Sequence, residues 1–73
     1  MSVARVTEIS VISPTSFDDA VKEGISRATK TLRNVRAAWV KEQRVLVHDN
    51  RITGWEVHLM VTFILEDGDS AAS

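Results

Sequence analysis

Two tryptophans and a carboxylate–imidazole pair are the side chains of this sequence best suited to binding chemistry. Trp39 has a ring that can stack on a flat aromatic ligand, and a place in a core or an interface is the alternative. Trp55 lies in an alternating apolar run, which predicts a core position. Glu56 and His58 are two residues apart and would share one face of a strand. They are a possible metal-binding pair, to which symmetry copies of the chain could add ligands. Two ligands alone do not make a metal site, so we interpret them as a hydrated or interface polar pair and predict no metal ligands.

Covalent catalysis and phosphate binding by a glycine loop find no support in the sequence. Hydroxyl groups gather between Ser10 and Ser16, but no histidine–aspartate pattern accompanies them, and the chain has no cysteine. The three glycines are far apart, which argues against a phosphate-binding loop. We therefore predict that the protein is not an enzyme.

The chain is short and nearly neutral. It has 73 residues, is 44% hydrophobic and carries a formal net charge of −1. This predicts a single domain over residues 1–67 and a disordered tail over residues 68–73. The balanced charge argues against a nucleic-acid partner, and the apolar runs are too short to span a membrane. The N-terminal segment has no basic region followed by an apolar one, so we expect a cytoplasmic protein.

The first half of the chain predicts a strand followed by a helix. Residues 3–12 are rich in β-branched side chains, and Pro14 ends this strand. Ser16 is expected to cap a helix that ends near residues 33–35. Its predicted apolar stripe comprises Phe17, Ala20, Val21, Ile25, Ala28, Leu32 and Val35. Gly24 lies beside the stripe, where it either allows a strand or a second helix to approach closely or is simply tolerated.

The second half predicts an antiparallel hairpin, with strands over residues 37–47 and 51–65 and a polar turn at residues 48–50. Apolar groups also stand at positions of the opposite parity; these are Val40, Leu46, Ile52, Met60 and Ile64. One helix can cover only one face of a sheet, so this second apolar face would remain exposed in a monomer. The order β-α-β-β therefore predicts a homo-oligomer that buries the second face between copies.

Four short motifs give the chain its resemblance to a known family. They are a Ser-Pro-Thr-Ser helix entry at residues 13–16, a Thr-Leu-Arg-Asn helix exit at 31–34, Glu42-Gln43-Arg44, and a Phe-x-Leu-Glu-Asp ending at 63–67. In this order and spacing the sequence resembles the dodecins over residues 3–67. The resemblance implies an α+β fold in which a three-stranded antiparallel sheet wraps one helix, and a hollow homo-dodecamer. It also implies storage of a flavin (riboflavin, FMN or FAD), stacked between paired tryptophans at two-fold-related sites.

Two positions of the implied flavin site depart from the family pattern. Ala37 stands where flavin-binding dodecins carry the stacking tryptophan, and Trp39 lies about 6.6 Å further along the strand. Glu56 replaces a glutamine that bonds the polar edge of the flavin, and an ionised carboxylate only accepts hydrogen bonds.

The matching Glu-Gln-Arg segment supplies the other candidate cofactor-binding residues, Gln43 and Arg44. An arginine there suits a ligand phosphate, and a salt bridge to Glu42 or Glu8 between subunits is the alternative. The expectation from the resemblance is thus a dodecamer with weakened or altered flavin binding. The alternative is a non-flavin dodecin that forms a structural or calcium-binding shell.

Overall fold

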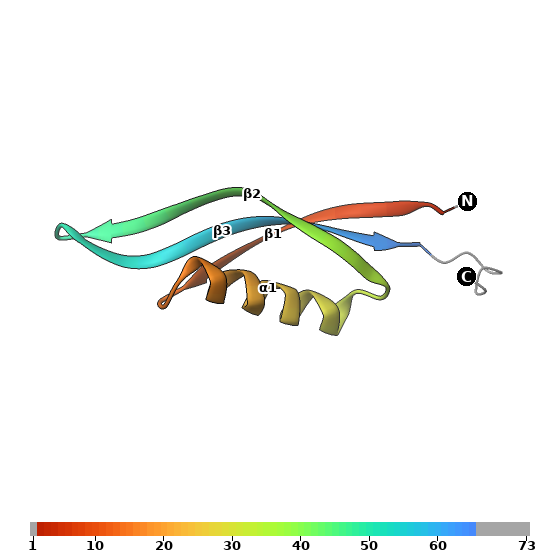
Figure 1. Ribbon diagram of the computed structural model, residues 1–73, viewed down its shortest axis with the longest axis horizontal. Helices are drawn as coiled ribbons and strands as arrows, with labels where there is room; N and C mark the ends of the chain where they lie inside the picture. The colour runs from red at the N-terminus through yellow and green to blue at the C-terminus, as the bar shows by residue number, and fades with distance from the viewer. Residues whose placement is uncertain (1, 66–73) are drawn as a thin grey trace.

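The computed structural model describes residues 2–65, and the predicted tail at 68–73 and the end of the predicted domain at 66–67 lie outside them. The elements are β1 (Ala4–Ser13), α1 (Phe17–Thr31), β2 (Val35–His48) and β3 (Arg51–Ile64). They form one antiparallel sheet in the order β1-β3-β2, which confirms the predicted β-α-β-β order and the hairpin. The molecule is elongated, with extents of 55 × 18 × 13 Å. Helix α1 covers one face of the sheet, and no helix or strand within residues 2–65 covers the other face (Figure 1).

Helix α1 begins where the sequence predicts. The Ser16 hydroxyl accepts a hydrogen bond of 2.9 Å from the Asp19 backbone amide, so Ser16 is the N-cap. Ser13, which is buried, fixes the turn before the cap, because its Oγ donates to Asp19 Oδ2 at 2.6 Å and accepts from the Thr15 amide at 2.9 Å. This first turn therefore joins the end of β1 to the start of α1.

The predicted end of the helix is wrong by two to four residues. Helix α1 stops at Thr31; Leu32 has an extended backbone, with φ of −107° and ψ of 141°. Asn34 then adopts a positive φ of 60°, a conformation that asparagine tolerates and that reverses the chain into β2. Leu32 and Val35 are therefore not helical, although both still pack against the core from the connection and from the start of β2.

The core lies between α1 and the central strand. It consists of Ala20, Ala28, Val57, Leu59 and Val61. Gly24 separates the two alanines on the same stripe, and a Cβ atom built there would lie 2.8 Å from both Leu59 Cδ1 and Val11 Cγ2. Gly24 therefore permits the close approach of helix and sheet, which decides between the two roles open to it in the sequence.

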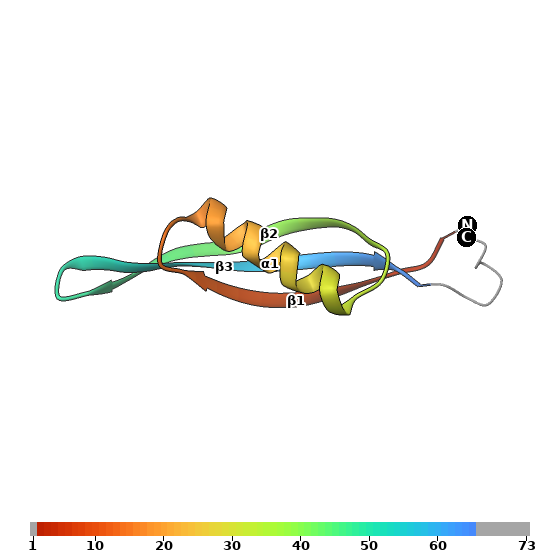
Figure 2. The ribbon, with the colours of Figure 1, turned by 90° about the horizontal axis from the view of Figure 1, so that it is seen from below.

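The β2–β3 hairpin extends well beyond the start of α1 (Figures 1 and 2). Its turn residues Asp49 and Asn50 have φ values of 52° and 63°, as a two-residue type I′ hairpin requires, so the predicted turn is confirmed. Helix α1 does not cover the side chains of this arm, and Val47 and Ile52 are 61% and 53% exposed. In residues 2–65 no helix has the length and apolarity needed to span a membrane.

Candidate functional site

The sheet face turned away from α1, which we call the far face, gathers four of the five predicted cofactor-binding residues. Along β3 the core residues alternate with even-numbered residues that point to the far face. In the strand register Ala37 pairs with Thr62, Trp39 with Met60 and Arg44 with Glu56, so all of these lie on the far face. Gln43 pairs with Val57 and lies on the opposite side, away from the other four.

A β-bulge explains how Trp39 and Arg44 reach the same face although one number is odd and the other even. The register shifts between Val40 and Glu42, which leaves Lys41 unpaired with β3. Without this extra residue, alternation would place Trp39 and Arg44 on opposite sides of the sheet. The same register places Val40 opposite Leu59, on the helix side, so the prediction of Val40 on the second apolar face is wrong.

An ion-pair network crosses the far face from β2 to β1. Arg44 Nε donates to Glu56 Oε1 at 2.8 Å, and His58 Nε2 lies 2.7 Å from Glu56 Oε2. His58 Nδ1 lies 3.3 Å from Glu8 Oε2, and Lys41 Nζ donates to Glu8 Oε1 at 3.3 Å. Glu56 is only 6% exposed, so this carboxylate is taken out of water with both of its oxygens occupied. Among the described residues Arg44 thus pairs with Glu56, while the salt bridge between subunits stays a prediction.

These contacts shift the pKa values of the groups that make them. The hydrogen bond from Arg44, followed by that from His58, lowers the pKa of Glu56. The bonds from His58 and Lys41 lower the pKa of Glu8. The two carboxylates in turn raise the pKa of His58, with Glu56 contributing most. The polar part of the far face is therefore a set of mutually neutralised charges.

Exposed apolar side chains surround the network, as the sequence predicts for a second apolar face. Trp39 is 51% exposed, Val6 is 46% exposed and Ile12 is 59% exposed. Gly54 places no side chain on this face, and a Cβ atom built there would lie 3.3 Å from both Ile12 Cγ2 and Leu46 Cδ1. Trp55, predicted to be a core residue, is half-buried and lies outside the buried cluster.

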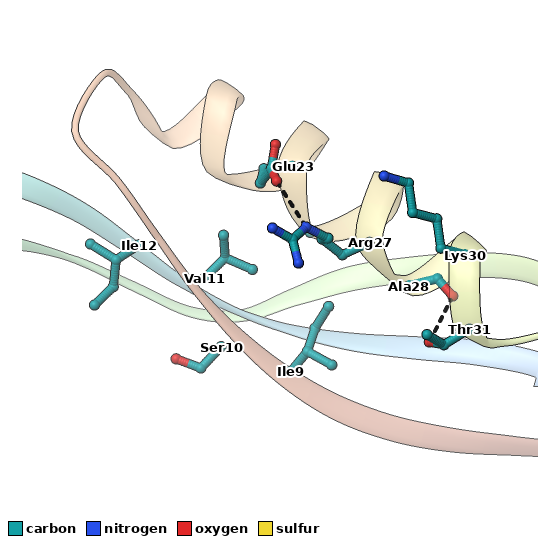
Figure 3. Close-up of a pocket in the computed structure, with 10 residues that line it drawn as sticks. Ile9, Ser10, Val11, Ile12, Glu23, Arg27, Ala28, Lys30 and Thr31 are labelled. Carbon is teal, nitrogen blue, oxygen red and sulfur yellow. Dashed lines mark hydrogen bonds and ion pairs between the residues drawn. The ribbon is translucent and has the colours of Figure 1, made fainter.

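A hollow lies elsewhere, along the free edge of β1 beside α1 (Figure 3). It has a volume of about 620 Å³, and Ile9 and Val11 form its floor with the helix above them. Its rim carries the exposed ion pair of Glu23 and Arg27, at 3.3 Å. None of the predicted site residues lines it. A second groove, of about 400 Å³, follows the β2 edge, and Ala37 and Trp39 belong to its lining.

The described residues hold no group of three or more histidine and acidic side chains arranged to bind a metal ion. Glu56 and His58 share one face, as the sequence predicts, but they bond to each other. Sequence reasoning missed Glu8 as a second carboxylate beside His58. The two residues are 50 positions apart and meet only through the pairing of β1 with β3.

Comparison with known proteins gives a consistent assignment. The family model described as Dodecin matches residues 3–66. A curated relative, the calcium dodecin of Mycobacterium tuberculosis, is 35% identical over 63 residues, which cover 86% of this chain and 89% of that protein. The dodecin structure from Streptomyces davaonensis has a TM-score of 0.84 at 38% identity and covers 90% of this chain and 97% of that one. The structure of the M. tuberculosis calcium dodecin, reported with a calcium-binding site, has a TM-score of 0.78 at 32% identity. The match covers 89% of this chain and 93% of that one. This chain therefore belongs to the dodecin family.

Proposed function

We propose that this dodecin is a small ligand-binding protein of the cytoplasm that assembles into a hollow homo-dodecamer and sequesters a flavin between the far faces of two-fold-related subunits. The observation that carries the proposal is the far face itself. It presents a half-exposed Trp39 ring beside Ala37, with the Arg44–Glu56 ion pair further along the same face. A flat aromatic ring with a polar edge suits a surface of this kind, because the tryptophan can stack on the ring while a charged group meets the edge.

The proposed flavin affinity is weaker than in dodecins that have the stacking tryptophan. Ala37 offers no ring, and a lost stacking contact is worth about 1–3 kcal/mol by analogy with nucleobases. That corresponds to about a 5- to 150-fold loss of affinity per site. Glu56 adds to the loss, because both of its oxygens already accept hydrogen bonds and it has no donor to offer the ligand. The proposed role is sequestration of the ligand without turnover.

Riboflavin fluorescence tests this proposal in the assembled protein. Wild type should quench added riboflavin only at high protein concentration, whereas Ala37→Trp combined with Glu56→Gln should quench it strongly. Trp39→Ala should weaken the residual binding, and Trp55→Phe, away from the far face, serves as the matched control. A double variant that remains a dodecamer yet fails to bind riboflavin would contradict the proposal.

Calcium binding is the second candidate, because a relative at 35% identity carries the name calcium dodecin. Within one chain, however, Glu8 and Glu56 are both engaged by cationic partners. A hard cation needs six to eight oxygen ligands, so a calcium site would have to combine carboxylates from several copies. Calorimetric titration of the chelator-washed wild-type dodecamer with calcium distinguishes the two candidates. Heat of calcium binding by wild type, together with no quenching of riboflavin by the double variant, favours the calcium shell.

A further inference from the structure

His58 stands between two carboxylates that come from different strands. Its Nε2 lies 2.7 Å from Glu56 Oε2 on β3 itself, and its Nδ1 lies 3.3 Å from Glu8 Oε2 on β1. The side chain is 26% exposed, so water can reach the ring but does not surround it. Both ring nitrogens thus face an acceptor oxygen.

Only one protonation state of the ring satisfies this geometry. A neutral imidazole has a single N–H, so one of its nitrogens would turn a lone pair toward a carboxylate oxygen. The imidazolium has two N–H groups and donates to both carboxylates. The carboxylates themselves are ionised near neutral pH, because Arg44 and Lys41 bond to their remaining oxygens. The direction of the His58 pKa, which the two carboxylates raise, agrees with this geometric argument.

The charges around His58 balance only when it is protonated. Glu8 faces His58 from β1, and Glu56 lies on the same strand as His58. Three further charged residues stand on β2; these are Lys41, Glu42 and Arg44. Three carboxylates then meet three cations, including His58. When Glu42 is counted with the hydrogen-bonded groups, loss of the proton leaves a net charge of −1 around His58 and breaks a contact that ties β1 to β3.

We infer that His58 is a proton-dependent positioning residue of the far face: as an imidazolium it holds Glu56 and Glu8 in place, and its deprotonation releases Glu8 and makes the face more anionic. The effect of this deprotonation on ligand binding rests on the proposed function. The contact that His58 makes between β1 and β3, which we call the clamp, does not rest on it. The sign follows from linkage. Because the pKa of His58 is raised on folding, the stabilisation is complete below the ordinary histidine value of about 6.5 and is lost as the pH rises through the folded-state value.

Melting temperatures of the unliganded dodecamer between pH 5 and 9 test the clamp. Wild type should lose stability as the pH rises through the His58 transition, and His58→Gln should flatten this part of the profile. His48→Gln is the matched control, because His48 is exposed at the hairpin turn and should leave the profile as in wild type. Glu8→Gln removes one of the two negative charges that face the ring and should move the inflection to lower pH.

An inflection that persists in His58→Gln, or that Glu8→Gln leaves in place, would overturn the inference. Should His58→Gln fail to fold, the shift of the inflection in Glu8→Gln decides alone. For the ligand consequence, FMN should lose affinity relative to riboflavin between pH 7 and 9 in wild type but not in His58→Gln. Absence of riboflavin binding at every pH would contradict the proposed function, while the melting profiles would still decide the role of His58.

Discussion

Replacing Gly24 by alanine tests the packing that positions α1 on the sheet. In an exposed helix this change stabilises by about 1 kcal/mol, because alanine is the better helix former. Here the new Cβ would lie 2.8 Å from both Leu59 Cδ1 and Val11 Cγ2, closer than carbon atoms can approach without displacement. Leu59 is only 1% exposed and its Cδ1 would have to shift within a packed core, and Val11 is stiff at χ1. Overpacking of this kind costs about 1–3 kcal/mol, so we expect a net loss of up to about 2 kcal/mol.

The assay is denaturant unfolding at fixed protomer concentration, because the stability of an assembled protein depends on concentration. The pair Ser26→Gly and Ser26→Ala, at an exposed helix position, measures the helix propensity term without contact to the sheet. In a double-mutant cycle, Val11→Ala should be less damaging when combined with Gly24→Ala than in wild type, because it removes one of the two clashing atoms. If Gly24→Ala stabilises by as much as the Ser26 pair differs, the close approach of helix and sheet is refuted.

Three further predictions concern the cap, the turn and the acid limit. Ser16→Ala should lower stability by about 1 kcal/mol through loss of the N-cap, measured by thermal unfolding; an unchanged melting temperature would contradict the cap. Asn50→Ala should cost about 1 kcal/mol because of its positive φ, whereas Asn50→Gly should be neutral or stabilising, and equal effects of the two would speak against the type I′ turn. Stability should fall as the pH drops below the ordinary carboxyl range, since the lowered pKa of Glu8 and of Glu56 means that each stabilises only when ionised. Arg44→Gln should move this acid limb to higher pH in a melting profile, and an unmoved limb would refute the role of the Arg44–Glu56 pair.

The elements of the fold could be predicted from the sequence because local chemistry specifies them. Alternation in β3, the Ser16 cap and the Asp49-Asn50 turn each act within a few residues, and each occurs where expected. The end of α1 was missed because apolar spacing continues through Leu32 and Val35 after the helix has stopped. The extended backbone of Leu32 ends the helix and the positive φ of Asn34 then turns the chain into β2, and apolar periodicity carries no information about either.

The site depended on information that the sequence does not contain. The bulge at Lys41 decides that Trp39 and Arg44 share a face, and no residue type there marks it. The Arg44–Glu56 and His58–Glu8 contacts depend on strand register, and register is a long-range property of the sheet. The second apolar face, by contrast, was visible from parity alone, apart from Val40, which the strand register places on the helix side.

The mass of the particle in solution, measured by light scattering at micromolar protomer concentration, tests the central claim most directly. The claim is that other copies of the chain cover the far face, with its exposed Trp39, Val6 and Ile12. For a closed shell of twelve chains of 8.1 kDa, the account predicts a mass of about 97 kDa. A stable monomer of 8.1 kDa would contradict it, because the far face would then be exposed to water and could not form a site between subunits.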